Sequence, residues 1–454
     1  MTSWRPSLQG RRGPRYRLIA QALADDVETG RLIPGQRLPT HRELAFALGV
    51  TIGTVTRAYA EAERQGLTAG EVGRGTFVRS RFDSIQPSSE ARYELGMNAP
   101  IGGSEAACFA QALHRLAENP ALGELCTYPD LAGLYEHRAA ACRMLAGLGV
   151  PATPERVMLT AGGGGALSAA LDLLVHPGET IATEELTYPN FKALARMRDI
   201  RLRGLACDRD GILVDAFAEA AAEGGIKALY CIPTMHNPTG LTWSIERRHA
   251  IAEIARRHRI AIIEDDVYGF LVPDRPASFV SLVPELVLHV NAASKSLAPA
   301  LRLGLLVVPQ ALVGRLTGSH WIASPLMAEI VRLWVEDGTA EMLMEEKRRE
   351  GAARQAIVRR VLDQAGLSHA VSHPNAFHLW LPLPEGWRDT EAVAAAARIG
   401  IAVNPAAAFA VGRSEHNAIR LCFSRPAGRD QVERGVARLA ELLIGSPEPA
   451  APIA

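Results

Sequence analysis

Lysine is rare in this sequence, and one of its lysines, Lys295, has neighbours that would suit a reactive amine. Of 49 Lys and Arg residues, only Lys192, Lys227, Lys295 and Lys347 are lysines. Lys347 lies in a charged run and is predicted to be on the surface, whereas Lys295 lies among small and apolar residues before the apolar run 301–308. A desolvated lysine can lose its proton and act as a nucleophilic amine. Lys295 is therefore a candidate for Schiff-base chemistry, and a lysine whose stem lies along the surface is the alternative.

Other polar residues that could serve the same chemistry also follow or interrupt apolar runs. Asp265 and Asp266 come directly after the run 260–263. An acid at the end of a buried strand needs a cationic partner, unless it caps the next element. Asn237 lies in a turn, and Arg420 alternates with apolar residues, which usually directs an arginine to solvent or to a surface acid. Taken singly, each of these residues has a purely structural explanation.

Short apolar runs alternate with helical patterns from residue 157 onward, which predicts an α/β fold with a mostly parallel sheet. In such sheets, ligands bind at the carboxyl ends of the strands, where Tyr188, Asn237, Asp265 and Lys295 fall. The run 157–160 is followed by four glycines and a helical pattern. A glycine turn that leads from a strand into a helix could hold a phosphate group, because backbone N–H groups point at the ligand.

These features together match the needs of one cofactor. Pyridoxal 5'-phosphate requires a lysine for its aldehyde, an acid for its ring nitrogen, donors to its phenolic oxygen and a phosphate cradle. The order of the glycine loop, Tyr188, Asn237, Asp265 with Tyr268, Lys295 with Arg302, and Arg420 resembles a fold-type I aminotransferase over most of residues 96–445. The resemblance implies a large, mostly parallel-sheet domain with a smaller α+β domain.

The resemblance also implies a role for each matching residue. Lys295 would form the internal aldimine and then move the Cα proton, and Asp265, three residues before Tyr268, would pair with the pyridinium. Arg420 would clamp a substrate carboxylate. The remaining contacts would be Asn237 and Tyr268 on the phenolic oxygen, Tyr188 stacked on the ring, Ser294, Arg302 and the loop with Gly163 and Gly164 on the phosphate, and Tyr128 on the phosphate of a neighbouring subunit in a homodimer. Gly163, Gly164 and Ala292 depart from the family pattern, which shifts phosphate binding towards the backbone and Arg302.

The first 80 residues have a different character. They contain twelve arginines, no lysine and seven acidic residues, a net charge of +5 in a chain whose formal net charge is zero. A basic end on a balanced chain suggests an anionic partner for that end. Helical spacing, a capping box from Thr40 to Glu43 and closely spaced glycines predict a helix-turn-helix followed by a hairpin wing. A small helical module with solvated arginines is the alternative.

The segment from Tyr16 to Val78 closely resembles the winged-helix domain of GntR-type bacterial repressors. The resemblance implies that the third helix enters the major groove of double-stranded DNA and that basic side chains contact phosphates. The candidate contacts are Arg42, Thr51, Gly53, Thr54, Thr56, Arg57 and Arg74. Ile52 stands where the family commonly has an arginine, which puts the pattern of base recognition in question.

The whole chain thus resembles a MocR-type regulator of the GntR family. We expect a winged helix-turn-helix at 1–79, a linker at 80–95, an aminotransferase-like domain at 96–445 and a disordered tail at 446–454. The expected function is transcription regulation, in which an amino compound or the cofactor is sensed through an aldimine at Lys295. The alternative is an active amino-acid aminotransferase with an accessory winged helix. Scattered cysteines, no signal core and no membrane-length apolar run favour a cytoplasmic protein with neither a metal site nor a membrane partner.

Overall fold

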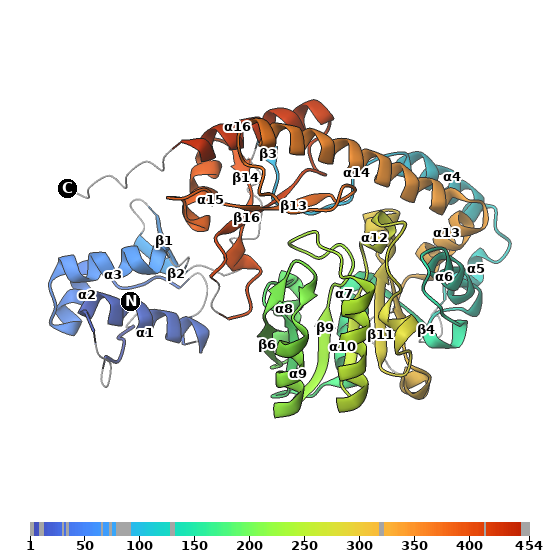
Figure 1. Cartoon of the computed structure of the whole chain (residues 1–454), viewed down its shortest axis with the longest axis horizontal. Coiled ribbons are helices and arrows are strands. Elements are labelled where there is room, and N and C mark those ends of the chain that lie inside the picture. The colour runs from blue at the N-terminus through green and yellow to red at the C-terminus, as the bar shows by residue number, and fades with distance from the viewer. Residues whose placement is uncertain are drawn as a thin grey trace. The chain divides into compact units, whose positions relative to one another are not determined.

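The computed structural model describes residues 4–8, 13–29, 31–32, 36–64, 67–71, 75–78, 92–127, 132–316, 322–412 and 415–445. The chain divides into two compact units, Met1–Ser89 and Glu90–Ala454. Figure 1 shows the elements of each unit. Arg74, Tyr128 and the expected tail 446–454 lie outside the described residues.

The first unit is a winged helix-turn-helix, as predicted. Its elements are α1 (Arg15–Glu28), α2 (His41–Leu48), α3 (Ile52–Arg64), β1 (Thr68–Glu71) and β2 (Gly75–Val78), and the two strands pair antiparallel. Apolar residues at helical spacing form its core, among them Ile19 and Leu23 of α1 and Val55 and Ala58 of α3, all completely buried. The helical periodicity in the sequence therefore identified the inner faces correctly.

The turn between α2 and α3 is set by local chemistry. The Thr40 hydroxyl accepts a hydrogen bond from the Glu43 N–H at 3.3 Å, and the Glu43 carboxylate accepts one from the Thr40 N–H at 2.8 Å. These two bonds complete the predicted capping box. Gly49 ends α2 with φ of 61° and ψ of 41°, a left-handed conformation that glycine adopts without strain. The Thr51 hydroxyl then accepts from the Thr54 N–H at 3.2 Å and starts α3.

The second unit is built on a seven-stranded sheet. Its strand order is β4 (Val157–Ala161), β12 (Leu303–Val307), β11 (Val287–Ala292), β10 (Ala261–Asp265), β9 (Ile226–Cys231), β5 (Thr180–Glu184) and β6 (Arg201–Leu205). β12 is antiparallel to both of its neighbours, and the pairs among β11, β10, β9, β5 and β6 are parallel. The mostly parallel sheet predicted from the alternation of elements is confirmed.

Alternate side chains of β4 pack against helices on opposite faces of this sheet. Leu159 of β4 belongs to the core shared with helices α6 (Tyr135–Gly147), α9 (Val214–Glu223), α10 (Ile245–His258) and α13 (Pro325–Glu336). The preceding residue, Met158, belongs to the core shared with α7 (Gly162–Leu174) and α8 (Pro189–Met197) on the other face. Burial on both faces explains why strands such as β4 and β12 are nearly continuous apolar runs.

A smaller α+β domain follows the long helix α14 (Thr339–Gln364). Its sheet has the order β13 (His378–Pro382), β16 (Ala418–Cys422) and β15 (Asn404–Pro405), and α15 (Asp389–Arg398) and α16 (Arg429–Ile444) pack with it. β3 (Tyr93–Glu94) pairs in parallel with β14 (Ile401–Ala402). Residues 93–94 lie in the range expected as linker, yet they pair within this small domain.

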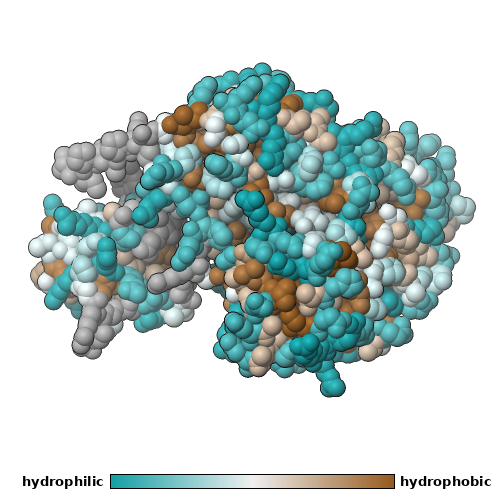
Figure 2. Space-filling view, viewed as in Figure 1, coloured by the Kyte–Doolittle hydropathy of each residue, from teal (hydrophilic) through white to brown (hydrophobic). Residues whose placement is uncertain are grey.

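The remaining elements are short or peripheral. They are α4 (Glu105–Ala117), α5 (Leu122–Leu125), α11 (Phe279–Leu282), α12 (Ala293–Ser296), the two-residue strands β7 (Cys207–Asp208) and β8 (Gly211–Ile212), and five short 3-10 turns. The face shown in Figure 2 is mainly hydrophilic, with scattered groups of apolar residues. Within the described residues, no helix is both long and apolar enough to cross a bilayer.

The prediction that Lys347 is a surface residue is wrong. Its side chain is 1% exposed, on the inner side of α14, and its ammonium lies 3.6 Å from the Glu105 carboxylate. Buried residues recur along α14 at a helical spacing, so a charged run on this helix must place some members inward. The run of charges in the sequence concealed that periodicity.

Candidate functional site

Lys295 lies on the short helix α12, directly after β11. Its amine donates a hydrogen bond to the backbone carbonyl of Asn98 and lies 5.6 Å from the centre of the Tyr268 ring. Burial lowers the pKa of the Lys295 ammonium from 10.5 to about 8, and the positive charge of Arg420 adds to the lowering. The amine is thus closer to its nucleophilic, neutral form at ordinary pH than an exposed lysine would be.

The two acids at the end of β10 have different surroundings. Asp266 forms an ion pair with Arg275 and lies 3.5 Å from the His289 ring nitrogen. Asp265 is 3% exposed and accepts a hydrogen bond from the Tyr230 hydroxyl at 2.8 Å. Burial raises the pKa of the Asp265 carboxyl to about 6, although the Tyr230 hydrogen bond opposes that rise. Within the described residues Asp265 has no ion pair, so it remains available to a cation on a ligand.

Arg420 and Asn237 meet in the site. The guanidinium of Arg420 donates to the Asn237 side-chain oxygen at 2.8 Å and to the Gly96 carbonyl at 2.6 Å. Its guanidinium carbon lies 4.7 Å from the centre of the Phe409 ring. Arg420 is only 6% exposed, so it does not have the solvent-facing position usual for a strand arginine. A planar, buried guanidinium with donors in a fork suits a carboxylate.

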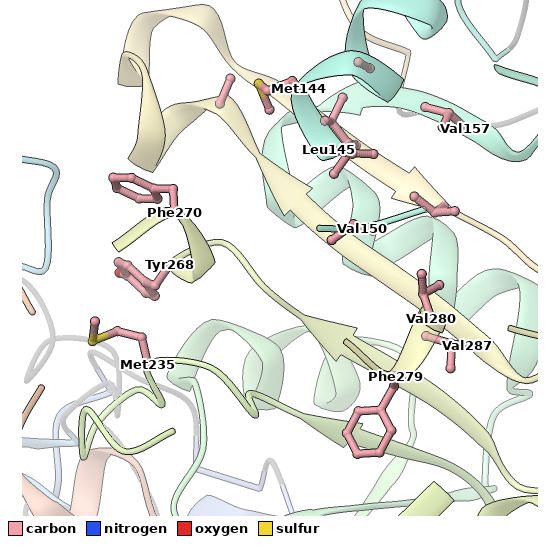
Figure 3. Close-up of a cluster of buried hydrophobic side chains, with 14 of the residues drawn as sticks. Met144, Leu145, Val150, Val157, Met235, Tyr268, Phe270, Phe279, Val280 and Val287 are labelled. Carbon is pink, nitrogen blue, oxygen red and sulfur yellow. The ribbon is translucent and has the colours of Figure 1, made fainter. Parts of the chain in front are cut away.

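Two tyrosines lie near these groups. Tyr188 immediately precedes α8, and burial together with the negative charge of Asp265 raises the pKa of its hydroxyl. The positive charges of Arg420 and Arg302 lower the pKa of the same Tyr188 hydroxyl. Asp265, Arg420 and Arg302 therefore all lie close enough to Tyr188 to affect its ionisation. Tyr268 is buried, and Figure 3 shows it between Met235 and Phe270.

The glycine loop forms the first turn of α7, next to Arg302. A Cβ atom added to Gly162, which has φ of +78°, would lie 3.0 Å from the Arg302 guanidinium. A Cβ added to Gly164 would meet nothing within 4 Å, and one added to Gly163 would lie 3.4 Å from the Ala292 methyl. A helix N-terminus beside an arginine favours an anion. Ser294 is half-buried on α12, two residues after Ala292.

The candidate DNA-binding residues lie in the first unit. Arg42, Thr51, Gly53 and Arg57 are exposed, whereas Thr54 and Thr56 are half-buried. The Thr56 hydroxyl donates to the carbonyl of Ile52 at 3.0 Å, and the hydroxyls of Thr51 and Thr54 lie 2.9 Å apart. Ile52 itself is 49% exposed at the start of α3.

Comparison with known proteins identifies both units. Residues 93–439 match the model of the aminotransferase class I and II family. The chain belongs to that family. Residues 15–78 match the gntR family of bacterial regulatory proteins, so a GntR helix-turn-helix is fused to an aminotransferase unit, as predicted.

Two transcriptional regulators are similar to this chain along most of their length. The chain is 29% identical to the uncharacterized HTH-type transcriptional regulator YdeF of Bacillus subtilis, over 97% of each chain. It is 27% identical to the vitamin B6 salvage pathway transcriptional repressor PtsJ of Salmonella typhimurium, over 89% of this chain and 93% of PtsJ. Among solved structures, an archaeal alanine:glyoxylate aminotransferase superposes with a TM-score of 0.71 and 25% identity, covering 80% of this chain and 97% of that one.

Several residues of the aminotransferase unit that shape the site were missed from the sequence. Tyr230 supports Asp265, and its ring stacks on Phe191 with centres 3.5 Å apart. His378 binds the Asn98 side chain at 3.0 Å and the His236 carbonyl at 3.0 Å, and burial lowers its pKa to about 3. A tyrosine inside a buried strand needs a partner for its hydroxyl, which is a signal that could have singled out Tyr230.

Proposed function

We propose that this protein is a pyridoxal-phosphate-dependent, DNA-binding transcription regulator, which senses an amino compound or the cofactor through Lys295. Support comes from the fusion of a GntR unit to an aminotransferase unit and from regulators that are similar over nearly the whole chain. One of these regulators, PtsJ, is named for the vitamin B6 salvage pathway. Vitamin B6 is the precursor class of the proposed cofactor, which makes a link between the cofactor and regulation reasonable.

The residues present fit the cofactor. Asp265 is buried without an ion pair among the described residues, and a pyridinium nitrogen would supply the missing cation. Arg302 beside the first turn of α7 provides positive charge and N–H donors for a phosphate. Lys295 has a lowered pKa and lies next to Tyr268. The cofactor, when bound, supplies an aldehyde that condenses with amines and a ring that withdraws electrons.

The chain's own residues would divide the work of ligand capture. Lys295 would provide the amine, and Asp265 would hold the ring nitrogen protonated with the help of the Tyr230 hydroxyl. Asn237 and Tyr268 would donate to the phenolic oxygen, and Tyr188 would pack on the ring. The phosphate would be held by Ser294, Arg302 and the loop at Gly163 and Gly164, with Tyr128 reaching a second subunit of a homodimer. Arg420 would bind the ligand carboxylate through its fork of donors.

One observation carries the sensing proposal: the two groups that would capture a ligand are both held by one short backbone segment. Lys295 donates to the Asn98 carbonyl, and Arg420 donates to the Gly96 carbonyl. A carboxylate on Arg420 would compete with the Gly96 carbonyl. The Lys295 amine would leave the Asn98 carbonyl when it joins the cofactor, and a ligand amine that displaces Lys295 from the cofactor would free it to bind Asn98 again. In the chain, residues 96–98 follow the connection from the winged helix. Ligand capture would thus change the contacts of the segment nearest to the DNA-binding unit in sequence.

The DNA partner would be read by α3. The exposed candidates Thr51, Gly53 and Arg57 and the half-buried candidates Thr54 and Thr56 would lie at the major groove. Arg42 would contact a phosphate, as would Arg74 of the wing. Purified protein is expected to bind the DNA upstream of its own gene, and the affinity is expected to fall as salt rises. An Arg57→Ala variant should bind more weakly, whereas Arg434→Ala, an exposed position of α16, should not. Salt-insensitive binding, or none, would contradict the proposal.

A second candidate function is turnover as an aminotransferase, because no residue of the proton-transfer set is replaced. Lys295, with a pKa of about 8, could carry a proton between substrate atoms. A panel of amino donors with a keto acid, followed over many turnovers, separates the two functions. A sensor consumes at most one equivalent of amino donor per protein chain, whereas an enzyme continues to convert donor over many turnovers.

A further inference from the structure

A cavity of about 330 Å³ lies beside the candidate cofactor site, and none of the residues assigned to the cofactor lines it. Its walls come from the end of β5, the β7–β8 hairpin, the loop that follows β9, and the small domain. Its volume is at the lower end of the range of roughly 300 to 1,000 Å³ that small-molecule pockets occupy. The cavity is therefore large enough for a small ligand.

The walls of the cavity are mostly apolar and aromatic. Leu186, Leu241, Trp243, Val371 and Trp380 line it. Trp243 and Trp380 are 1% and 6% exposed, so each presents a fixed ring rather than a mobile one. Burying an apolar or aromatic body against such walls is favourable by roughly 25 cal/mol per Å² of apolar surface removed from water. The walls thus favour a ligand with an apolar body.

One end of the cavity is acidic. Glu184 is 1% exposed, and its carboxylate accepts hydrogen bonds from the Ile232 N–H at 2.8 Å and the Thr183 hydroxyl at 3.2 Å. Each carboxylate oxygen can accept a second hydrogen bond. His236 is 3.9 Å away, but burial lowers its pKa to about 4, so at neutral pH it does not neutralise Glu184. Glu184 thus has no cationic partner among the described residues.

The other charged residues of the lining are occupied or exposed. Glu185 lies 3.3 Å from the His416 ring, and Asp208 pairs with Arg247 at 2.8 Å. Arg209 is exposed. A buried carboxylate without a cation costs free energy, and this burial raises the pKa of the Glu184 carboxyl to about 7. A ligand ammonium would remove that cost and favour the charged form of Glu184.

We propose that this cavity is a second ligand site, which binds a small protonated amine with an apolar or aromatic body. This second site is distinct from the ligand site proposed at Lys295, because the cavity lining contains no residue assigned to the cofactor. The site also adjoins the carboxylate clamp. Trp380 pairs with Arg420 across β13 and β16, both side chains contact the Phe409 ring, and His236 immediately precedes Asn237. A ligand in this cavity would therefore contact Trp380, which packs with Phe409 beside Arg420.

The test uses N,N-dimethylphenethylamine, a tertiary amine that is protonated at neutral pH and cannot form a C=N bond with an aldehyde. Its binding to the full-length, cofactor-loaded protein is measured by isothermal titration calorimetry. 3-Phenylpropionate, an anion of similar size, serves as the comparison probe. We expect the amine to bind at least tenfold more tightly than the anion. Equal binding of the two probes, or no binding of the amine at millimolar concentration, would overturn the proposal.

Three variants locate the site. Val371→Phe fills the cavity and Glu184→Gln removes its charge but keeps an acceptor, and each should weaken amine binding at least tenfold. Met197→Phe, at an 81% exposed position of α8, should leave binding unchanged. The visible absorbance of the bound cofactor shows whether each variant still folds and loads. If Val371→Phe fails to fold, Glu184→Gln alone decides, and amine binding that neither variant changes would refute the assignment. Amine binding is measured as heat and does not use the cofactor, so it can be repeated on protein without cofactor; a failure of the cofactor proposal would therefore be distinguishable from a failure of this one.

Discussion

Tyr230 offers a sensitive test of how the site is built, because Tyr230→Phe removes one hydroxyl and little else. The hydroxyl donates to Asp265 at 2.8 Å, and the ring is stacked on Phe191 with an interplanar angle of 10°. A phenylalanine keeps the stacking. A hydrogen bond to a charged group contributes roughly 1.5 to 3 kcal/mol, so its loss should raise the pKa of Asp265 by about one to two units. A carboxyl that is more easily protonated pairs less well with the pyridinium.

The expected result is a tenfold to hundredfold weaker affinity for pyridoxal 5'-phosphate, since about 1.4 kcal/mol corresponds to a factor of ten. Equilibrium loading of the apo protein, followed by visible absorbance across cofactor concentrations, measures it. The control is Tyr59→Phe in the winged helix, which removes a hydroxyl that donates to the Pro39 carbonyl at 2.8 Å. Unchanged affinity in Tyr230→Phe would refute the link between Tyr230, Asp265 and the cofactor, as would an equal loss in Tyr59→Phe.

Three further predictions concern charge and capping. Burial lowers the pKa of Lys295 to about 8, so the neutral fraction of its amine grows as pH rises. The rate of cofactor capture by the apo protein, measured by stopped flow, should therefore increase through about pH 8 and then level. A rate that keeps rising towards pH 10 would contradict the lowered pKa. Arg275→Met leaves Asp266 buried without its ion pair, and the free energy of unfolding in urea should fall by about 3 kcal/mol or more. Arg434→Met, which breaks an exposed ion pair with Asp430, should lower the free energy of unfolding much less, and equal losses in the two variants would contradict that difference. Thr40→Ala should lower the unfolding free energy of the winged helix by about 1 kcal/mol in calorimetry, and no change would show that the capping box is dispensable.

Local patterns in the sequence predicted much of the fold. Thr40 and Glu43 form their capping box because that exchange of hydrogen bonds needs only residues three apart. Apolar runs separated by helical patterns predicted the parallel sheet, since each run is buried on both faces. Lys347 was misplaced because the inward face of a long charged helix is set by what packs on it.

The candidate site was only partly visible in the sequence. The side-chain chemistry of four residues predicted that they serve one cofactor: Lys295, Asp265, Asn237 and Arg420. The fold places Arg420 in contact with Asn237, and the charges of Arg420 and Asp265 both act on Lys295. The contacts to the carbonyls of residues 96 and 98 could not be foreseen, because every residue has a carbonyl and only the tertiary fold selects two of them. The cavity beside Trp380 depends on the end of β5, the β7–β8 hairpin, the loop after β9 and the small domain meeting, which no local pattern specifies.

The central claim is that ligand capture at Lys295 changes DNA binding. The most direct measurement is the affinity of the full-length, cofactor-loaded protein for its operator, at fixed salt, with and without a saturating amino compound that alters the cofactor absorbance. We predict a change of at least fivefold in wild-type protein, the size of a typical coupling between sites of roughly 1 kcal/mol, and none in Lys295→Ala. An operator affinity that stays the same in wild-type protein while the cofactor absorbance changes would contradict the claim.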